Sequence, residues 1–249
     1  MAHRDEAEPM RRRILLAAAS AAALPIPGQA RAEEAVDIAL VLAVDVSRSI
    51  DEDEARLQRE GYRTAIADPV VLAAVRGGMV GAVAIAYVEW AGIEYQRTVI
   101  PWRRIATQAQ ADDWAAELAA APRTSLSWTS ISGAIRYSRQ MLGECPWEAT
   151  RRVIDVSGDG VNNSGPPADQ QRDAAVAEGI TINGLPIIND RPTFGRMPPV
   201  PLDDYYRENV IGGDGNFMIV AEDFESFGVA VKRKLIREIA SLPAGIIPA

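Results

Sequence analysis

The sequence predicts an α/β fold, a doubly wound, mostly parallel six-stranded sheet with helices on both faces. Apolar runs rich in Val, Ile and Leu, above all residues 36–46, are typical of strands buried on both faces. Helical segments separate these runs, and such alternation favours a parallel sheet covered by helices. The chain of 249 residues, 48% hydrophobic and 24% charged, is long enough to bury one large core.

The expected elements follow in chain order. Strands are predicted at residues 36–46, 81–90, 96–102, 152–157, 180–188 and 216–221, and helices at 54–76, 106–121, 130–142, 169–178 and 224–240. The first helix should break near Asp68-Pro69, because proline cannot continue a helix interior. The last helix has an apolar stripe, made by Phe224, Phe227, Val231, Leu235 and Ile239.

Residues 189–215 do not fit the alternation. They hold four prolines, the run Asp203-Asp204-Tyr205-Tyr206 and several glycines, and we expect an irregular loop insertion there. Loops of this length are usually functional or mobile. A surface loop carrying one short helix is the alternative.

Residues 1–32 have the pattern of a cleavable export signal. Three arginines, Arg11 to Arg13, precede a short apolar run at 14–24, and Ala30-Arg31-Ala32 forms a small-residue cleavage site. The apolar run is shorter than the roughly 20 residues that span a bilayer. We therefore expect cleavage after Ala32, by the Sec or the twin-arginine route, and a periplasmic or secreted protein consisting of a single domain, 33–249. An uncleaved helix on the membrane surface is the alternative.

Composition excludes several classes of function. A formal net charge of -8 is unlike that of a phosphate-backbone binder, so nucleic acid is not an expected partner. His3 is the only histidine and Cys145 the only cysteine. A Ser-His-Asp triad, a Cys-His pair and a zinc site rich in His or Cys therefore cannot form. Cys145 is expected to be a small buried apolar side chain.

Oxygen-bearing side chains follow two of the predicted strands. Asp45, Ser47 and Ser49 come at the end of the first strand, and Asp159 follows the strand at 152–157. Thr129 opens a helix between them. Because ligands of open α/β sheets bind beyond the carboxyl ends of the strands, these five residues should meet there. Such oxygens suit Mg²⁺, with Mn²⁺ or Ca²⁺ as other candidates. If the three hydroxyls bind directly, Asp45 and Asp159 act through waters and hydrogen bonds.

Each of these residues also has a purely structural interpretation. Ser49 could open a capping box for the following helix, Thr129 could be a helix N-cap, and Asp159 between two glycines could be a turn residue. Asp155 lies inside an apolar strand and needs a partner, which the sequence does not identify.

Together, Asp45-x-Ser47-x-Ser49, Thr129 and Asp159-Gly160 resemble the metal-ion-dependent adhesion site of von Willebrand factor type A (vWA) domains. The resemblance covers about residues 36–240 and, more narrowly, points to a family of exported bacterial vWA-like proteins of unknown function. It implies a vWA fold and the five residues above as the metal site. The sequence departs from the pattern at Ser157-Gly158-Asp159, where the family more often has a threonine directly before the aspartate.

These features favour an exported binding module that captures a protein through a divalent cation. A partner's Asp or Glu would complete the coordination, and Tyr205 and Tyr206 are expected to add specificity as surface anchors. We do not expect an enzyme, because the chain after residue 32 has no histidine and no evident general base. A metal-dependent hydrolase using the same residues, and a structural envelope subunit with a vestigial metal site, remain the alternatives.

Overall fold

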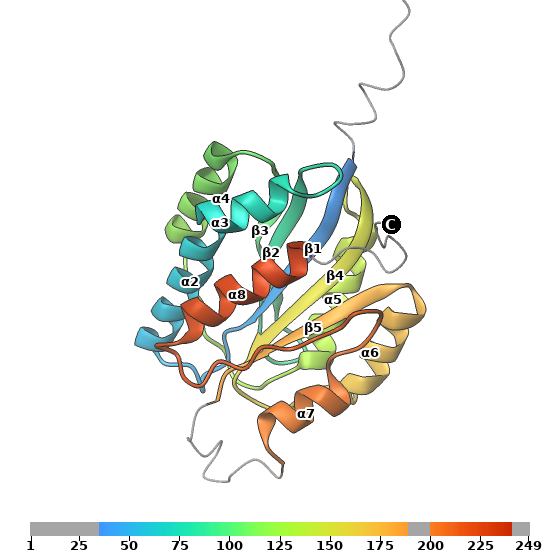
Figure 1. Cartoon of the computed structure of the whole chain (residues 1–249). Coiled ribbons are helices and arrows are strands. Elements are labelled where there is room, and N and C mark those ends of the chain that lie inside the picture. Colours follow the sequence, from blue (N-terminus) through green and yellow to red (C-terminus); the bar gives the residue numbers. More distant parts are fainter. Residues whose placement is uncertain (1–34, 189–199, 241–249) are drawn as a thin grey trace, which may run out of the picture.

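The computed structural model describes residues 35–188 and 200–240, so the expected export signal lies outside the described residues. A five-stranded sheet with strand order β3-β2-β1-β4-β5 forms the centre of the molecule (Figure 1). Its strands are β1 (Ala35–Asp45), β2 (Val83–Trp90), β3 (Gln96–Ile105), β4 (Glu148–Gly158) and β5 (Ile180–Pro186). All neighbours pair in parallel except β2 and β3, which form an antiparallel hairpin. The predicted α/β class and mostly parallel sheet are confirmed.

The expected sixth strand is not formed. Residues 216–221 run beside β5, but they form only isolated bridges, one from Met218 to Gly184 of β5 and one from Ala221 to Ile187 just after it. Two features of β5 interrupt a regular ladder. The side chain of Asn183 accepts the N–H of Phe217, at 2.9 Å, and Pro186 has no N–H to donate.

Helices cover both faces of the sheet (Figure 1). One face carries α2 (Glu52–Ile66), α3 (Pro69–Arg76), α4 (Gln108–Ala120) and α8 (Phe227–Ala240). The other carries α5 (Ile131–Gly143), α6 (Ala168–Ala177) and the short α7 (Leu202–Asn209). The expected break at Pro69 separates α2 from α3, with Asp68 capping the second helix.

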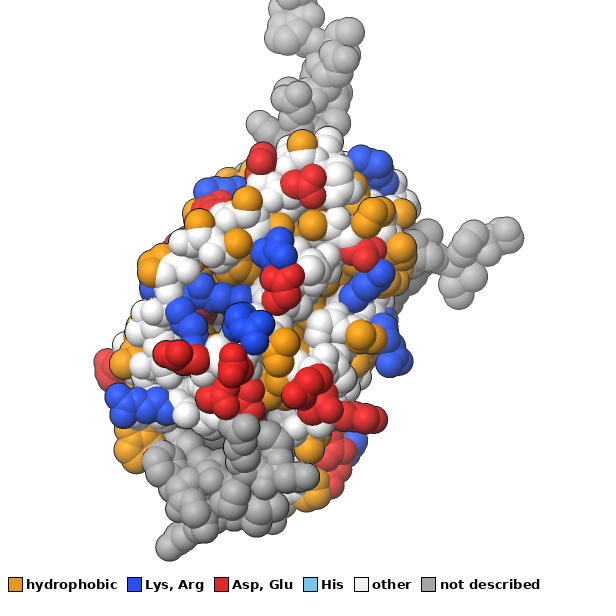
Figure 2. All heavy atoms as spheres, turned by 90° about the vertical axis from the view of Figure 1, so that its left-hand side faces the viewer, with side chains coloured by type: hydrophobic (Ala, Val, Ile, Leu, Met, Phe, Trp, Pro, Cys, Tyr) orange, Lys and Arg blue, Asp and Glu red, His pale blue; other side chains and the backbone are white. Residues whose placement is uncertain are grey.

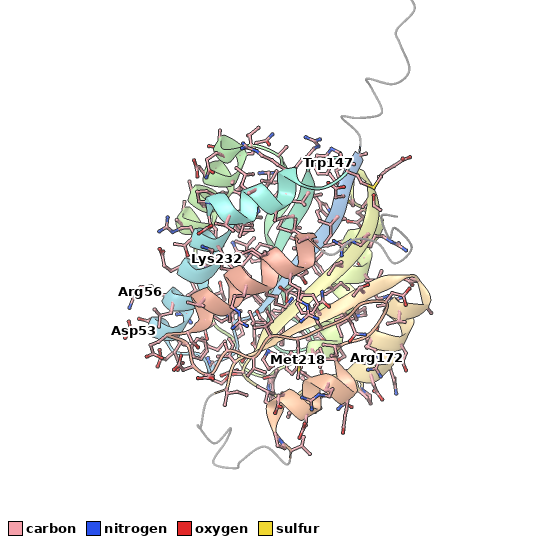
Figure 3. The ribbon with its side chains drawn as sticks, viewed as in Figure 1. Asp53, Arg56, Trp147, Arg172, Met218 and Lys232 are labelled. Carbon is pink, nitrogen blue, oxygen red and sulfur yellow. The ribbon has the colours of Figure 1, made fainter. Side chains whose placement is uncertain are left out.

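Two apolar cores result from this layering, because every residue of β2 and almost every residue of β1 is buried on one face or the other. Tyr62, Trp114 and Phe227 fill the core under α2, α4 and α8. The outer side of α2 is polar, and its Asp53 and Arg56 form an exposed ion pair (Figure 3). Cys145 is half-buried against apolar neighbours. No helix within the described ranges is long and apolar enough to cross a membrane.

The segment expected to be an irregular loop contains α7. This helix packs its Leu202 and Tyr206 into the core on the side of α6, while residues 189–199 lie outside the described part of the chain. The charged and polar side chains of α7, among them Asp203 and Arg207, pair on its outer side. An amphipathic helix of this kind is anchored by the sheet on which it lies.

A buried ion cluster lies between β4 and α8 and provides the partner that Asp155 requires. The Lys234 ammonium lies 2.7 Å from Asp155 Oδ1 and 2.8 Å from Glu238 Oε1. Asn183 donates to the same Glu238 oxygen at 2.8 Å. Lys234, Asp155 and Glu238 are each almost inaccessible to solvent. One buried cation thus faces two buried acids and can neutralise the charge of only one of them. The other acid is therefore more stable in its protonated, uncharged form.

This cluster predicts how stability depends on pH. Burial first of all, and then Glu238, raise the pKa of Asp155 to about 7, although Lys234 opposes the shift. An unfolded aspartate titrates near 3.9. Between these two pH values the folded chain therefore holds a proton that the unfolded chain has lost. The contribution of this proton to the free energy of unfolding is complete below about pH 4 and is lost as the pH rises to about 7.

We expect the stability of wild type relative to Asp155→Asn to fall across that interval, by at most about 1.4 kcal/mol per pH unit. Urea unfolding of both proteins between pH 4 and pH 8 measures the difference. A difference that stays flat or rises with pH contradicts the prediction.

Candidate metal site

The topology brings two strand ends together. The chain leaves β1 for β2 on one side of the sheet and returns to β4 on the other, so strand order reverses between β1 and β4. Val44 of β1 lies beside Ser157 of β4 in the parallel register. The loops that follow these strands meet at the lower end of the sheet in Figure 1. In open α/β sheets this is where ligands bind.

Four of the five predicted side chains form a hydrogen-bonded chain at this edge. Asp45 Oδ1 accepts the backbone N–H of Ser47 at 2.7 Å, which folds the loop back on the strand end. The hydroxyls of Ser47 and Ser49 lie 2.9 Å apart, and Ser49 donates to Asp159 Oδ1 at 2.7 Å. Asp45 thus holds the backbone of Ser47 and Asp159 holds the Ser49 hydroxyl, and the two serine hydroxyls lie side by side between these acids. We call this group, with Thr129, the rim site.

Ser49 is not the cap of α2. Asp51 occupies that position, since its carboxylate accepts the N–H of Glu54 at 3.0 Å while the Glu54 carboxylate accepts the N–H of Asp51 at 2.9 Å. The capping box is thus two residues later than the pattern at Ser49 suggests. The Ser49 hydroxyl is used at the rim site instead.

Thr129 is not a helix cap either. The N-cap of α5 is Ser130, whose hydroxyl accepts the N–H of Gly133 at 3.1 Å. Thr129 is buried, and its hydroxyl would lie 3.6 Å from a Cβ at Gly160, which places it beside the Asp159 loop.

Two asparagines after Asp159, which are not among the predicted site residues, hold this arrangement together. The side-chain oxygen of Asn163 accepts the backbone N–H of Thr129, and the backbone N–H of Asn163 donates to the Thr129 carbonyl, both at 2.8 Å. Asn162 accepts the N–H of Ser132 at 3.0 Å. Asparagine pairs in a loop rich in Gly and Pro, directly after a strand-ending acid, are the signal that could have identified them.

The two carboxylates of the rim site destabilise each other's charge. Burial first, and then the nearby Asp159 carboxylate, raise the pKa of Asp45 well above its usual range, whereas hydrogen bonds from Ser47 oppose the shift. Asp45 Oδ2 has no hydrogen-bond partner among the described residues. Such a pair of acids is stabilised when a cation lies beside it.

The absence of a side chain at Gly158 leaves space for the Asp45 carboxylate and the Tyr206 hydroxyl. A Cβ at position 158 would lie 2.9 Å from Asp45 Oδ2 and 3.1 Å from the Tyr206 hydroxyl oxygen. The departure from the vWA pattern at Ser157-Gly158 therefore has a steric role, because a larger residue would displace one of its two neighbours.

The expectation that Tyr206 is a surface anchor is wrong. Its side chain is fully buried under the rim site, and burial, followed by Asp45 and Asp159, raises the pKa of its hydroxyl well above the usual range. The apolar packing of α7 places the ring in the core. Tyr205, its neighbour, is half-buried. The Tyr206 hydroxyl has no hydrogen-bond partner within residues 35–188 and 200–240.

The donor atoms fit a hard divalent cation. The rim site offers hydroxyl and carboxylate oxygens, which Mg²⁺, Mn²⁺ and Ca²⁺ prefer, and it includes an unpartnered buried carboxylate oxygen. Among the described residues no three His, Cys, Asp or Glu side chains are grouped so as to bind a metal. A metal site here therefore depends on Ser and Thr oxygens.

Comparison with solved structures identifies the fold. Proximal thread matrix protein 1 from the mussel byssus superposes with a TM-score of 0.60 and 14% identity, covering 83% of this chain and 48% of that one. The von Willebrand factor type A protein from Catenulispora acidiphila gives a TM-score of 0.54 and 14% identity, over 82% and 42% of the two chains. The pilus adhesin SpaC from Lactobacillus rhamnosus GG gives 0.59 and 13%, over 83% and 31%.

These likenesses show that the chain has the vWA fold, as its sequence pattern predicts. The chain spans about half the length of the mussel protein and less than half the length of the other two proteins. A second structure of the mussel protein is described as having a zinc-occupied MIDAS motif, the abbreviation for metal-ion-dependent adhesion site. A comparison with curated proteins found no match. A protein-family model matches residues 35–243, and its description is "Protein of unknown function (DUF1194)".

Proposed function

This chain belongs to the DUF1194 family of proteins of unknown function and has the vWA fold, and we propose that it is an exported binding module. It captures a protein partner through a divalent cation, Mg²⁺ in the first place, at the rim site. The residues that would hold the cation are Asp45, Ser47, Ser49, Thr129 and Asp159.

One observation carries this proposal. The hydroxyls of Ser47 and Ser49 lie 2.9 Å apart between two acids that come from different strands, while the capping roles they and Thr129 could have had belong to Asp51 and Ser130. Polar side chains that have no role in helix capping and converge at the reversal point of the sheet are typical of a ligand site.

The residues divide the work by charge. The neutral hydroxyls would bind the cation, while Asp45, which accepts the backbone N–H of Ser47, and Asp159, which accepts the Ser49 hydroxyl, would position them and offset part of the positive charge. A bound cation would supply a positive charge with an open coordination position, which favours an incoming carboxylate. We therefore expect an Asp or Glu side chain of the partner to complete the site.

The character of the related folds supports this proposal. SpaC is described as a pilus adhesin, and the mussel protein as a matrix protein with zinc in its MIDAS motif. The resemblance of residues 1–32 to an export signal supports a location of this module in the periplasm or outside the cell. In Figure 2 acidic side chains gather in the lower half of the molecule. Long-range repulsion of an acidic partner is screened beyond about 8 Å at physiological salt, so the short-range contact decides binding.

The double variant Ser47→Ala with Ser49→Ala tests the site. We expect it to abolish Mg²⁺ binding in calorimetry and leave the thermal midpoint of the metal-free protein nearly unchanged, because the apolar strands and helices fold without these hydroxyls. Ser125→Ala is the control, since that serine is exposed and lies outside the rim site. Unchanged Mg²⁺ affinity in the double variant would refute the site.

Capture of a partner from the source cell's envelope, with and without chelator, tests the function. Binding that requires Mg²⁺ or Mn²⁺, weakens in Thr129→Ala and fails when one partner acid becomes its amide supports the proposal. Binding that survives both chelator and Asp159→Ala indicates an ordinary protein surface. Hydrolysis of ester or phosphate substrates that is lost in Asp45→Ala would establish a hydrolase instead.

A further inference from the structure

A pocket of about 650 Å³ lies directly beside the rim site. Its lining includes Arg48, Ile93, Leu126, Trp128 and Asn163. Arg48 stands between the two rim serines, Trp128 precedes Thr129, and Asn163 exchanges backbone and side-chain hydrogen bonds with Thr129. The pocket therefore adjoins the rim site along all three of the chain segments that form it.

Trp128, which lines this pocket, is an exposed residue with an unusual backbone conformation. Its side chain is 56% exposed, and its φ of 74° lies in the left-handed region, which a large side chain rarely adopts. Neighbouring hydrogen bonds hold this conformation, since Ser130 donates to the Ala91 carbonyl at 2.7 Å and Leu126 to that of Val46 at 3.4 Å. Gly92 leaves room for it, because a Cβ there would lie 3.2 Å from Trp128 Cβ. Backbone strain of this kind concentrates at binding sites.

The charges around the pocket select its occupant. Arg48 is exposed and forms no ion pair with any acid in the described part of the chain. Its guanidinium favours an acidic segment at the side next to the rim site. Glu94, exposed on the lining, disfavours a second acid inside the pocket. The side chain that enters should therefore be uncharged, and Ile93, Leu126 and Trp128 offer it apolar contact.

We infer that this pocket receives an aromatic or large aliphatic side chain of the protein partner, one to three residues away from the acid that reaches the metal. This inference rests on the proposed function. We expect this short spacing in the partner because the pocket begins one residue from the rim site. Consecutive Cα atoms are about 3.8 Å apart, so a few residues of the partner can reach from one point to the other. The recognised motif is an acidic residue with an apolar neighbour, held at two adjoining points.

Four short capped peptides of Gly and Ser test it by calorimetry on the purified protein, with Mg²⁺ and with chelator. One position carries Glu or Gln, and a position two residues away carries Phe or Ala. In wild type with Mg²⁺ we expect the Glu/Phe peptide to bind about tenfold more tightly than the Glu/Ala peptide, because burial of a phenyl ring is favourable. The preference for Phe should be lost in Trp128→Ala.

Two further variants keep the test decisive. Trp128→Gly removes the indole at a φ that glycine adopts without strain, in case alanine disturbs the loop. Trp147→Ala is the control, because Trp147 lies at the opposite end of the sheet (Figure 3), and it should keep the preference for Phe.

The outcomes separate the two proposals. Equal binding of Phe and Ala peptides by wild type, or a preference for Phe that persists in both Trp128 variants, overturns the pocket. A preference for Phe without any preference for Glu over Gln in Mg²⁺ keeps the pocket and overturns the metal-bridged function. Failure of all four peptides to bind overturns both.

Discussion

Replacing Lys234 with methionine is expected to lower the free energy of unfolding by about 3–5 kcal/mol. The variant keeps a side chain of similar length but removes the only cation that contacts Asp155 and Glu238 in the described cluster. Both acids are buried, and without the lysine each must either remain charged with no compensating cation or take up a proton, which costs free energy at neutral pH. Removal of one partner from a buried ion pair leaves the desolvation cost of the other uncompensated, which is the reason for the large effect.

The matched control is Lys232→Met on the same helix. Lys232, labelled in Figure 3, pairs with Asp68 at 2.6 Å. Both side chains of this pair are partly exposed, so the variant should cost no more than about 1 kcal/mol. Adding Asp155→Leu to Lys234→Met should recover part of the loss, since one buried charge fewer remains. Urea unfolding at one pH measures all three proteins. Equal effects of the two lysine variants would show that the buried cluster does not stabilise the fold as argued.

Gly158→Ala is expected to weaken Mg²⁺ binding by about 10- to 100-fold, the range typical of changes behind the direct metal ligands. The added methyl group would lie 2.9 Å from Asp45 Oδ2 and 3.1 Å from the Tyr206 hydroxyl, and both neighbours are buried. Asp45 would have to move, and with it the Ser47 N–H that it accepts at 2.7 Å. The hydroxyls of the rim site would then lose their position.

Gly143→Ala at the end of α5 is the control, because a Cβ there meets no atom within 4 Å and its affinity for Mg²⁺ should not change. Calorimetric titration of both variants with Mg²⁺ measures the effect, and thermal unfolding shows whether each remains folded. A folded Gly158→Ala protein with wild-type affinity would contradict the role assigned to Asp45.

Much of the fold could be predicted because burial imposes a local pattern. The run at 36–46 is apolar on both sides, and β1 lies at the centre of the sheet with helices over each face. The break before Pro69 follows from the missing N–H of proline. The expected sixth strand shows the limit of this reasoning, since the pattern at 216–221 is strand-like but its neighbour β5 ends in Pro186 and cannot continue a regular ladder.

The candidate site could be predicted in its residue types but not in its division of roles. Ser49 and Asp51 are both capable of capping α2, and only the structure assigns the cap to Asp51. Thr129 and Ser130 present the same ambiguity at α5. Adjacent residues with similar side chains differ in role because the direction of each Cα–Cβ bond is decided by the backbone after folding.

The sequence by itself determined the α/β class, the order of most elements and the five oxygen-bearing residues, because periodicity and residue chemistry are local properties of the chain. Tertiary structure decided which side chains meet. Lys234 pairs with Asp155, Tyr206 is buried beneath Asp45, and Trp128 lines a pocket beside the rim site. These contacts join residues far apart along the chain, and they depend on strand order, register and helix packing, which become defined only when the two cores assemble around the sheet.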